Sequence, residues 1–427
     1  MARPGTESLI MEPQAGRPAG PSRGLTVYVR ALIVFDLALA TAIAPLLPYY
    51  THLAGLSKPG AGILMASYPL GILVGALPAG LLAGRLGPRA CVLLGLAVTA
   101  AAVLAFGWSS APGALAATRF AQGLAGSCVW VGGLAWLAAA TPLARRGEAL
   151  GPAYGFAAVG TLVGPVIGAF ANTAGPRLAF TTTAAAAAGL MAAATLLPGP
   201  PDMSALKLLP APAALRDRAV GTGVALTILA GMTVGALEVL APLRLSQLGA
   251  SVPLIAGVFF VAGCGEATLS PLIGKLSDRR GEAVPARFLL AAAAVVCLTF
   301  PLLGQVGWLA ALVALGMPAL GSLCVPGSTL LSAGAERLHL HQGVAFGAAN
   351  CAWSAGQFAA AAAAGAIAQA TSDFVPGALL AGLCVTAAAV LLPASPLRPR
   401  PLPSVPGAAG LAPPGPARSS PGGRGPQ

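Results

Sequence analysis

The sequence has few charged residues. Asp, Glu, Lys and Arg make up 8% of its 427 residues, whereas a soluble globular protein carries about 25%. Only three residues are lysine, namely Lys58, Lys207 and Lys275. Hydrophobic residues reach 56% and the mean hydropathy is +0.82. This composition excludes a soluble globular protein, because most of the chain cannot face water.

Catalytic and metal-binding motifs are also lacking. The sequence contains no H-E-x-x-H, no phosphate-binding G-x-x-x-x-G-K-[ST] and no nucleophile elbow. The seven cysteines form no C-x-x-C pair, so we expect free thiols rather than disulfides or metal ligands. We place all three histidines, His52, His339 and His341, in loops. The sequence therefore predicts no enzyme, no cofactor and no metal site.

Long apolar runs are abundant instead. Crossing about 30 Å of hydrocarbon takes about 20 apolar residues in a helix. Prolines inside such helices, for example Pro69, Pro78 and Pro165, are tolerated. The predicted membrane helices cover residues 28–50, 60–83, 90–108, 113–139, 149–171, 178–197, 219–243, 252–276, 286–304, 307–333, 343–369 and 375–393. The sequence thus predicts an all-α membrane protein with twelve transmembrane helices.

The basic residues are distributed unevenly over the loops between these helices. Twenty of the 24 lie on the side that carries both termini, whereas Lys58, Arg177 and Arg244 lie on the other side and Arg119 lies within a helix. Because cytoplasmic loops are enriched in Lys and Arg, we expect both termini in the cytoplasm and the protein in the cell membrane. The net charge of +12 then reflects topology rather than a nucleic-acid surface.

The chain repeats itself at an offset of 194 residues. Without a gap, residues 42–87 match residues 236–281 at 11 of 46 positions. The identical pairs include Pro48/Pro242, Gly55/Gly249, Ser57/Ser251, Arg85/Arg279 and Gly87/Gly281. A six-helix unit that occurs twice around a central cavity is an architecture typical of transporters. We expect an N-terminal half at 28–197 and a C-terminal half at 219–394.

The remaining segments differ in composition from the helices. Residues 1–27 and 395–427 are rich in Pro, Gly and Arg and lack an apolar period, so we expect disordered cytoplasmic tails. Residues 198–218 are the expected cytoplasmic linker between the halves. We expect a monomer in the lipid bilayer.

Four motifs stand in a characteristic order: "GLLAGRLGPRACVLLG" (80–95), "RFAQGLAG" (119–126), "GTLVGPVIG" (160–168) and "GKLSDRRG" (274–281). With them, residues 28–394 resemble the major facilitator superfamily, especially its drug:proton antiporters and the related vesicular amine carriers. The resemblance implies gating loops at Gly80, Gly84, Arg85, Gly87, Arg89, Gly274, Asp278, Arg279 and Gly281. It also implies an antiporter signature at Gly160, Gly164, Pro165 and Gly168. Gly84 stands where the family usually has an aspartate that latches the gate.

Four ionisable residues fall inside the predicted spans: Asp36, Arg119, Glu238 and Glu266. A charge at mid-membrane costs at least about 2.5–3.5 kcal/mol, so we expect them to face the interior and to serve in proton coupling. The resemblance implies that helices 1, 4, 7 and 10 line the cavity. The residues expected to line it are Asp36, Arg119, Gln122, Glu238, Ser322, Ser328 and Trp353. By helix rise, Arg119 and Glu238 can share one level, and Asp36 and Glu266 a deeper one.

Arg119 allows two interpretations. In the first, it is an interior arginine that pairs with backbone carbonyl groups or a carboxylate and holds its helix in place. Alternatively, it controls a carboxylate: a cation within about 4–6 Å favours the ionised form, so a change in distance during transport would take up and release a proton.

The sequence therefore predicts a proton-coupled antiporter that exports small amphipathic or cationic organic compounds, with the substrate and protons as its partners. Two alternatives remain open. One is a uniporter or importer of the same fold, which would transport without a pH gradient. The other is a membrane receptor or scaffold that binds a ligand and moves none.

Overall fold

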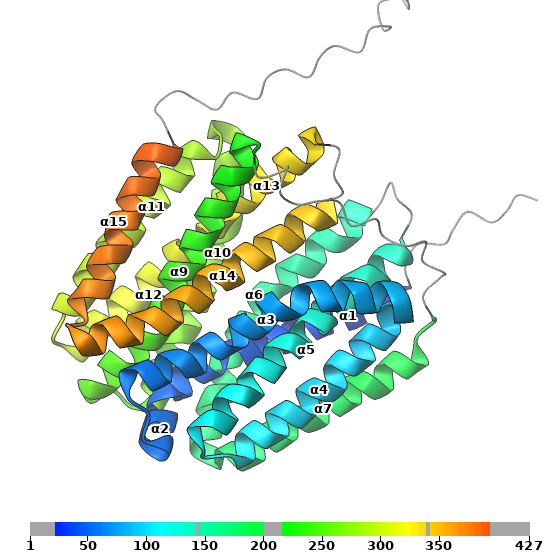
Figure 1. The fold of residues 1–427 in the computed structure, drawn as a ribbon, viewed down its shortest axis with the longest axis horizontal. Coiled ribbons are helices and arrows are strands. Elements are labelled where there is room, and N and C mark those ends of the chain that lie inside the picture. The colour runs from blue at the N-terminus through cyan, green and yellow to red at the C-terminus, as the bar shows by residue number, and fades with distance from the viewer. Residues whose placement is uncertain (1–21, 142–145, 200–215, 339–341, 393–427) are drawn as a thin grey trace, which may run out of the picture.

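The computed structural model describes residues 22–141, 146–199, 216–338 and 342–392, and every regular element in these ranges is a helix (Figure 1). The helices are α1 (Arg23–Thr41), α2 (Ile43–Ala54), α3 (Lys58–Leu86), α4 (Pro88–Trp108), α5 (Pro112–Ala139), α6 (Arg146–Ala174), α7 (Pro176–Leu196), α9 (Arg218–Gln247), α10 (Val252–Arg280), α11 (Ala283–Thr299), the short 3-10 helix η2 (Phe300–Leu302), α12 (Val306–Ser322), α13 (Cys324–Arg337), α14 (Gln342–Ala370) and α15 (Phe374–Leu391). In Figure 1 the N-terminal helices lie on one flank and the C-terminal helices on the other.

Within the described ranges the helices form twelve spans that are long and apolar enough to cross a membrane, which confirms the predicted all-α fold. Two spans of 32 residues each contain two helices, α1 with α2 and α12 with α13. With an even number of spans, α1 begins and α15 ends on the same side of the bundle. We call this the terminal side and the other face the opposite side.

Two spans predicted as continuous helices are interrupted, at Ala42 and at Leu323. In both, a proline stands three residues after the interruption. Pro45 cannot donate a backbone hydrogen bond to the carbonyl group of Thr41, and Pro326 cannot donate one to Ser322. Pro69 and Pro78, by contrast, lie within the unbroken helix α3. Proline alone therefore does not decide where a span breaks.

The internal repeat has structural causes. Gly55 and Gly249 have φ of 61° and 94°, and Gly87 and Gly281 have φ of 85° and 79°, a region that favours glycine. Each pair ends a helix that precedes a tight connection. The repeat-related residues Ser57 and Ser251 are the N-caps of α3 and α10, where their hydroxyl groups accept backbone hydrogen bonds. The repeated residues thus mark helix ends that recur in both halves.

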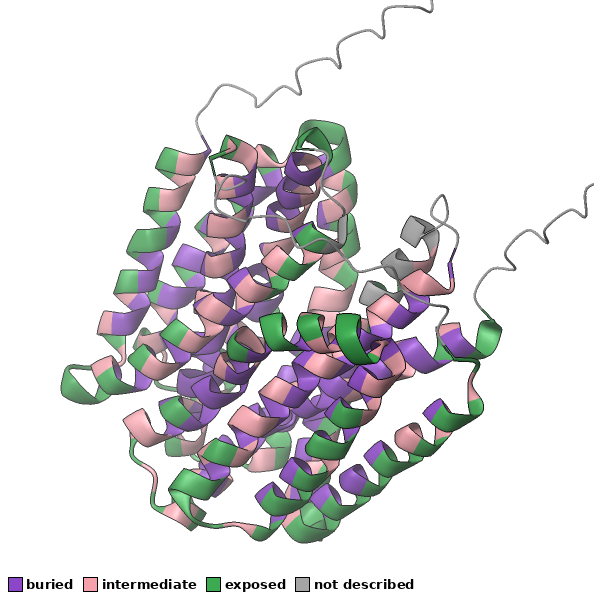
Figure 2. Ribbon diagram, turned by 45° about the vertical axis from the view of Figure 1, so that its right-hand side comes forward, coloured by how far each residue is buried: buried purple, intermediate pink, exposed green. Residues whose placement is uncertain are grey.

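Among the described residues, the hydrophobic core that joins the halves lies near the opposite side. One cluster contains residues from all over the C-terminal half, but its N-terminal members, such as Leu47, Leu64 and Phe106, come from helix segments near the opposite side. At the terminal side, the N-terminal half has a separate cluster around Trp136, and Val220 belongs to another in the C-terminal half. Figure 2 shows buried residues in the middle of the bundle and exposed ones on its outer helices. The halves are therefore packed together at one side and separate at the other.

Some predictions lie outside the described residues: most of the tail at 1–27, the tail at 395–427, most of the linker at 198–218, and His339 and His341. The prediction for His52 was wrong. It lies in the last turn of α2, because this helix continues to Ala54.

Candidate functional site

Arg119 binds the interrupted end of α1. Its guanidinium donates from Nη1 to the carbonyl oxygen of Leu39 (3.3 Å) and from Nη2 to that of Ala40 (3.2 Å). These carbonyl groups belong to the last turn of a helix, where helical partners are missing and the helix dipole is negative. The side chain is 1% exposed. This contact explains why an apolar helix carries a guanidinium, and it matches the first interpretation of Arg119.

Two further side chains hold Arg119. Nη1 also donates to Oε1 of Gln122 (2.9 Å), one turn along α5. The guanidinium carbon lies 4.6 Å from the ring centroid of Tyr68 on α3, within cation–π distance. Arg119 therefore links α1, α3 and α5, and its cation is fixed in one place.

Asp36 lies beside this group and is 4% exposed. Its Oδ2 accepts hydrogen bonds from Nε1 of Trp130 (2.7 Å) and from the hydroxyl group of Tyr68 (3.2 Å). A Cβ on Gly126 would lie 2.7 Å from Oδ1 of Asp36, so a residue without a side chain makes room for the carboxylate. Tyr68 thus contacts Asp36 through its hydroxyl group and Arg119 through its ring.

Glycines bring the helices of this half close to one another. A Cβ on Gly123 of α5 would overlap the carbonyl oxygen of Tyr68. The signature glycines of α6 lie against α1 and α2 in the same way: a Cβ on Gly164 would overlap Thr41, and one on Gly168 would lie 2.7 Å from the Ala42 carbonyl oxygen. Gly160 and Pro165 are buried on the same helix. The signature therefore packs α6 on the interruption that Arg119 binds.

Glu238 lies on α9, in the other half. It is 9% exposed, and its Oε2 accepts a hydrogen bond from Nε2 of Gln357 on α14 (2.7 Å). Glu238 and Arg119 interact electrostatically, and the two residues belong to different halves. Asp36 interacts with Arg119 as well, but both belong to the N-terminal half.

The other predicted cavity residues lie in the C-terminal half. Glu266 packs on Gly321 of α12, where a Cβ would overlap its carboxyl group. Its carboxylate interacts electrostatically with Glu238 and with Cys324, and the level that it shares with Asp36 stays a prediction. Ser322 is fully buried, whereas Ser328 and Trp353 are half-buried. These residues are spread over α10, α12, α13 and α14.

The predicted gating loops lie on the terminal side. Gly84, Arg85, Asp278 and Arg279 are exposed, and in the ranges that we describe Asp278 forms no ion pair. A Cβ on Gly80, Gly84 or Gly274 would meet nothing within 4 Å. Arg89 donates to the carbonyl oxygen of Thr195 (2.9 Å) within its own half. These loops therefore do not hold the halves together here.

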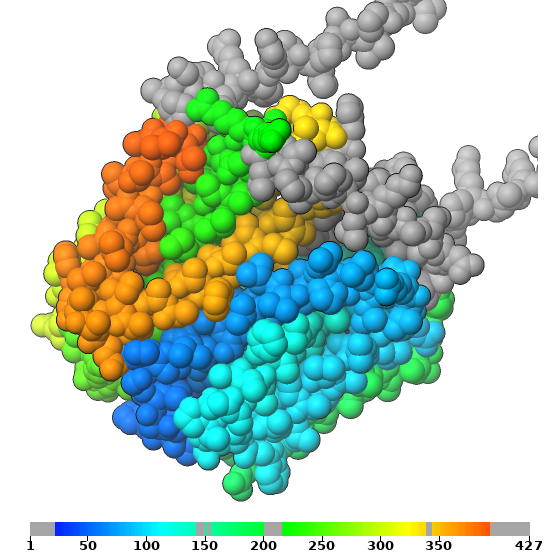
Figure 3. Space-filling model, viewed as in Figure 1, coloured from blue at the N-terminus to red at the C-terminus, as the bar shows by residue number. Residues whose placement is uncertain are grey.

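An ion pair connects the halves on the opposite side, and a second cation of the C-terminal half lies beside it. Nζ of Lys58, at the start of α3, lies 2.6 Å from Oδ1 of Asp373, which directly precedes α15. Nη1 of Arg244 on α9 lies 3.8 Å from Oδ2 of the same carboxylate. A Cβ on Gly62 would lie 2.5 Å from the Ala361 carbonyl oxygen, which shows how closely α3 and α14 approach here. Figure 3 shows these two helices in contact along their seam.

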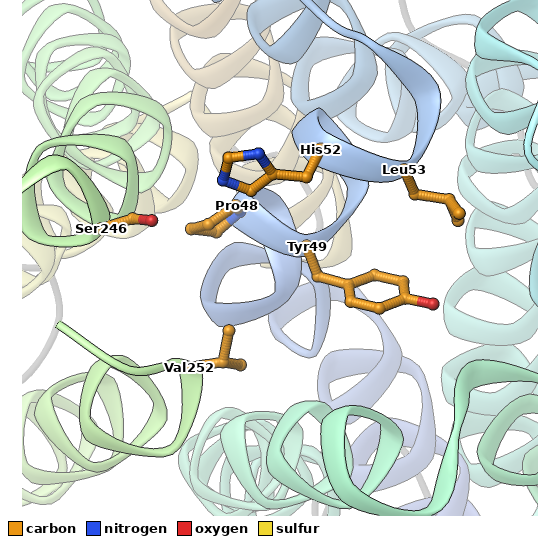
Figure 4. A pocket seen from close by; sticks show the side chains of 6 residues that line it. All are labelled: Pro48, Tyr49, His52, Leu53, Ser246 and Val252. Carbon is orange, nitrogen blue, oxygen red and sulfur yellow. The ribbon is translucent and has the colours of Figure 1, made fainter. Parts of the chain in front are cut away.

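A hollow of about 450 Å³ opens near these ion pairs (Figure 4). Its lining consists of Pro48, Tyr49, His52 and Leu53 of α2, Ser246 of α9 and Val252 of α10. None of the predicted site residues lines it. We therefore locate the candidate site in the buried groups around Arg119 and Glu238, and not in this hollow.

The predicted site residues lack three members of the site, Tyr68, Trp130 and Gln357. All three carry a polar group inside a long apolar helix, which was the available signal. Their partners depend on which helices meet: α3 packs on α5, and α14 packs on α9. That information is not local in the sequence.

The Major Facilitator Superfamily model matches residues 31–361. The chain belongs to the Major Facilitator Superfamily. A curated relative, the "Uncharacterized MFS-type transporter Rv1250" of Mycobacterium tuberculosis (strain ATCC 25618 / H37Rv), is 36% identical over 119 residues. The match covers 27% of this chain and only 21% of that relative's length.

Two solved structures share the fold of this superfamily member. One is a bacterial homolog of the human lysosomal transporter Spinster in an inward-facing and unoccupied conformation, with a TM-score of 0.66, 14% identity and coverage of 87% of this chain and 93% of that chain. The other is a D-xylose-proton symporter, with a TM-score of 0.68, 16% identity and coverage of 86% and 95%. At this identity, both similarities establish the fold alone.

Proposed function

We propose that this superfamily member is a secondary active transporter that exports small amphipathic or cationic organic compounds in exchange for protons. The observation that carries the proposal is the electrostatic interaction between Arg119 and Glu238, which lie on different halves. The halves share a core on one side only. A rocking motion between them therefore changes the distance between this cation and this carboxylate.

The size of the effect is sufficient for coupling. With an effective dielectric constant of about 20, two unit charges attract by about 2.8 kcal/mol at about 6 Å and by about 1.4 kcal/mol at about 12 Å. A difference of about 1.4 kcal/mol changes proton affinity about tenfold. The partners of Asp36, namely Tyr68, Trp130 and Arg119, belong to the same half as Asp36. A rocking motion between the halves therefore leaves the surroundings of Asp36 unchanged. Glu238 is therefore the first proton carrier to test, and Asp36 is the second.

The charge of the interior supports a cationic substrate. Asp36, Glu238 and Glu266 against Arg119 give a formal charge of 1 − 3 = −2, and a net negative site in a low-dielectric interior attracts cations. The close packing of the α6 signature glycines on α1 and α2 agrees with an exchanger.

The proposal includes a topology. The protein lies in the cell membrane as a monomer, with the terminal side in the cytoplasm, halves at 28–197 and 219–394, and the linker at 198–218. The conformation described above then has its halves separated toward the cytoplasm. Reporter fusions at Lys58 and at Arg146, which begin α3 and α6, should report opposite sides. If both report the same side, this topology is wrong.

The test of function is transport in proteoliposomes with an imposed pH gradient and a panel of organic cations. The wild type should move a cation against its gradient only when protons flow the other way. Glu238→Gln should abolish gradient-driven transport and leave substrate binding measurable. Asp217→Asn is the matched control, because Asp217 lies before α9 and outside the membrane.

Other outcomes separate the alternatives. Full gradient-driven transport by both Glu238→Gln and Asp36→Asn would exclude these residues as proton carriers. A transport rate that is the same with and without the pH gradient would indicate a uniporter. Binding with no transport would indicate a receptor or scaffold.

A further inference from the structure

The mechanism proposed above counts Glu266 in the charge of the interior but gives it no part in proton transfer, and this residue has an unusual position. It is the middle residue of α10 (Val252–Arg280) and therefore lies at mid-membrane. In the described part of the chain, no side chain or backbone group donates a hydrogen bond to its carboxylate, and no lysine or arginine pairs with it. Asp36 and Glu238, in contrast, both accept hydrogen bonds.

Two hydroxyl groups lie on the helices that meet at Glu266, and the Cys324 thiol at the start of α13 interacts with its carboxylate electrostatically. Ser270 lies one turn further along α10, on the same helix face. The hydroxyl groups of Ser270 and Ser322 are 3.0 Å apart, and Gly321, the neighbour of Ser322, packs on the Glu266 carboxyl group. The two hydroxyls and the carboxylate therefore gather where α10 meets α12.

The C-terminal end of α12 lies beside these hydroxyl groups. Helix α12 ends at Ser322, and Pro326 cannot supply the hydrogen bond that the Ser322 carbonyl group would accept in a continuous helix. The C-terminal end of a helix carries partial negative charge. In the N-terminal half, Arg119 donates hydrogen bonds to the free carbonyl groups at the C-terminal end of α1. At α12, the charged group that acts on Glu266 is a second carboxylate, that of Glu238.

We propose that Glu266, Ser270, Ser322 and the C-terminal end of α12 form a binding site for Na⁺. Carboxylate, hydroxyl and carbonyl oxygens are the ligands that hard cations prefer. Interrupted membrane helices use their free carbonyl groups to coordinate such ions. Gly321 and Glu266 are in direct contact, so the site fits a compact inorganic ion rather than an organic ammonium compound.

The test is thermal unfolding of the purified full-length protein in lipid nanodiscs. NaCl is titrated at fixed pH and constant ionic strength, with choline chloride as the replacement salt, and the series is repeated with KCl. A ligand that binds the folded state raises the unfolding midpoint with concentration. We expect a rise of a few degrees with Na⁺ that choline does not produce, and a smaller rise with K⁺.

Variants assign the effect to this site. Glu266→Gln should remove the Na⁺-dependent rise, and Ser322→Ala and Ser270→Ala should raise the half-maximal Na⁺ concentration about tenfold or more. Ser354→Ala on α14 is the matched control, because it removes another buried hydroxyl and should respond as the wild type does. If Glu266→Gln does not fold, the two serine variants still show whether Na⁺ binds at this site.

Two results would overturn the proposal. Equal midpoints in Na⁺, K⁺ and choline would show that the site binds no metal cation. A Na⁺ response that persists in Glu266→Gln and both serine variants would place the ion elsewhere. The measurement needs no transport and no organic substrate, so it is independent of the proposed antiport.

Discussion

Asp373 connects the two halves on the opposite side, and its removal should change the balance between conformations. Its carboxylate contacts Lys58 of the N-terminal half at 2.6 Å and Arg244 of its own half at 3.8 Å. Asp373→Asn keeps the shape of the side chain and one acceptor oxygen but removes the charge. The ion pair with Lys58 should exist only while this side is closed, so its loss should favour opening there.

The magnitude follows from the exposure of the pair. The side chain of Lys58 is 26% exposed and that of Asp373 is 12% exposed, so solvent screens the interaction in part. Measured ion pairs of this kind contribute about 0.2–1 kcal/mol. At the upper end, about 1 kcal/mol, the ratio of open to closed molecules changes about fivefold. High salt should reduce the difference between variant and wild type.

The assay is the rate of cysteine labelling at Ser246→Cys, which lines the hollow on this side, in a background without the seven native cysteines. Asp373→Asn and Lys58→Gln should each raise the rate up to about fivefold. Arg177→Gln is the control, because this opposite-side cation lies over Trp108 within its own half. Unchanged labelling in both Asp373→Asn and Lys58→Gln would refute the reasoning.

Four further predictions follow from single contacts. Arg119→Ala should lower transport and shift its pH optimum upward, because the cation no longer favours an ionised carboxylate; Arg119→Lys should rescue only part of the activity, since the two carbonyl contacts need the guanidinium fork. Gly123→Ala should destabilise the protein by about 1–3 kcal/mol through overpacking against α3, whereas Gly189→Ala, which meets open space, should not lower the unfolding midpoint. Gly84→Asp has room for its side chain and should favour closure of the terminal side; equal cysteine accessibility there in both proteins would contradict this. Burial raises the pKa of Asp217, but its hydrogen bonds to Arg337 and to the start of α9 outweigh this and lower the pKa overall. Its stabilising effect should therefore be present above about pH 4 and lost as the pH falls further, so the midpoint difference between the wild type and Asp217→Ala should shrink on acidification.

Much of the fold could be predicted from the sequence because the membrane imposes simple requirements. A span needs about 20 apolar residues whose backbone groups pair internally, and these runs are visible in the sequence. Gly55, Gly87, Gly249 and Gly281 could be paired as a repeat because positive φ at a helix end favours one residue type. The two interruptions could not be predicted in the same way. Pro45 and Pro326 follow breaks, whereas Pro69 and Pro78 lie within the continuous helix α3, and the neighbouring helices decide which outcome occurs.

The sequence by itself determined the twelve spans, the two related halves and the rare ionisable residues of the interior, because hydropathy and the scarcity of charge act locally. Only the tertiary structure decided the partners of those residues. It places Arg119 on the carbonyl groups of Leu39 and Ala40, Tyr68 between Arg119 and Asp36, and Gln357 on Glu238. These contacts join segments up to 119 residues apart. They depend on which helix faces meet, and close packing through residues such as Gly123 fixes those faces.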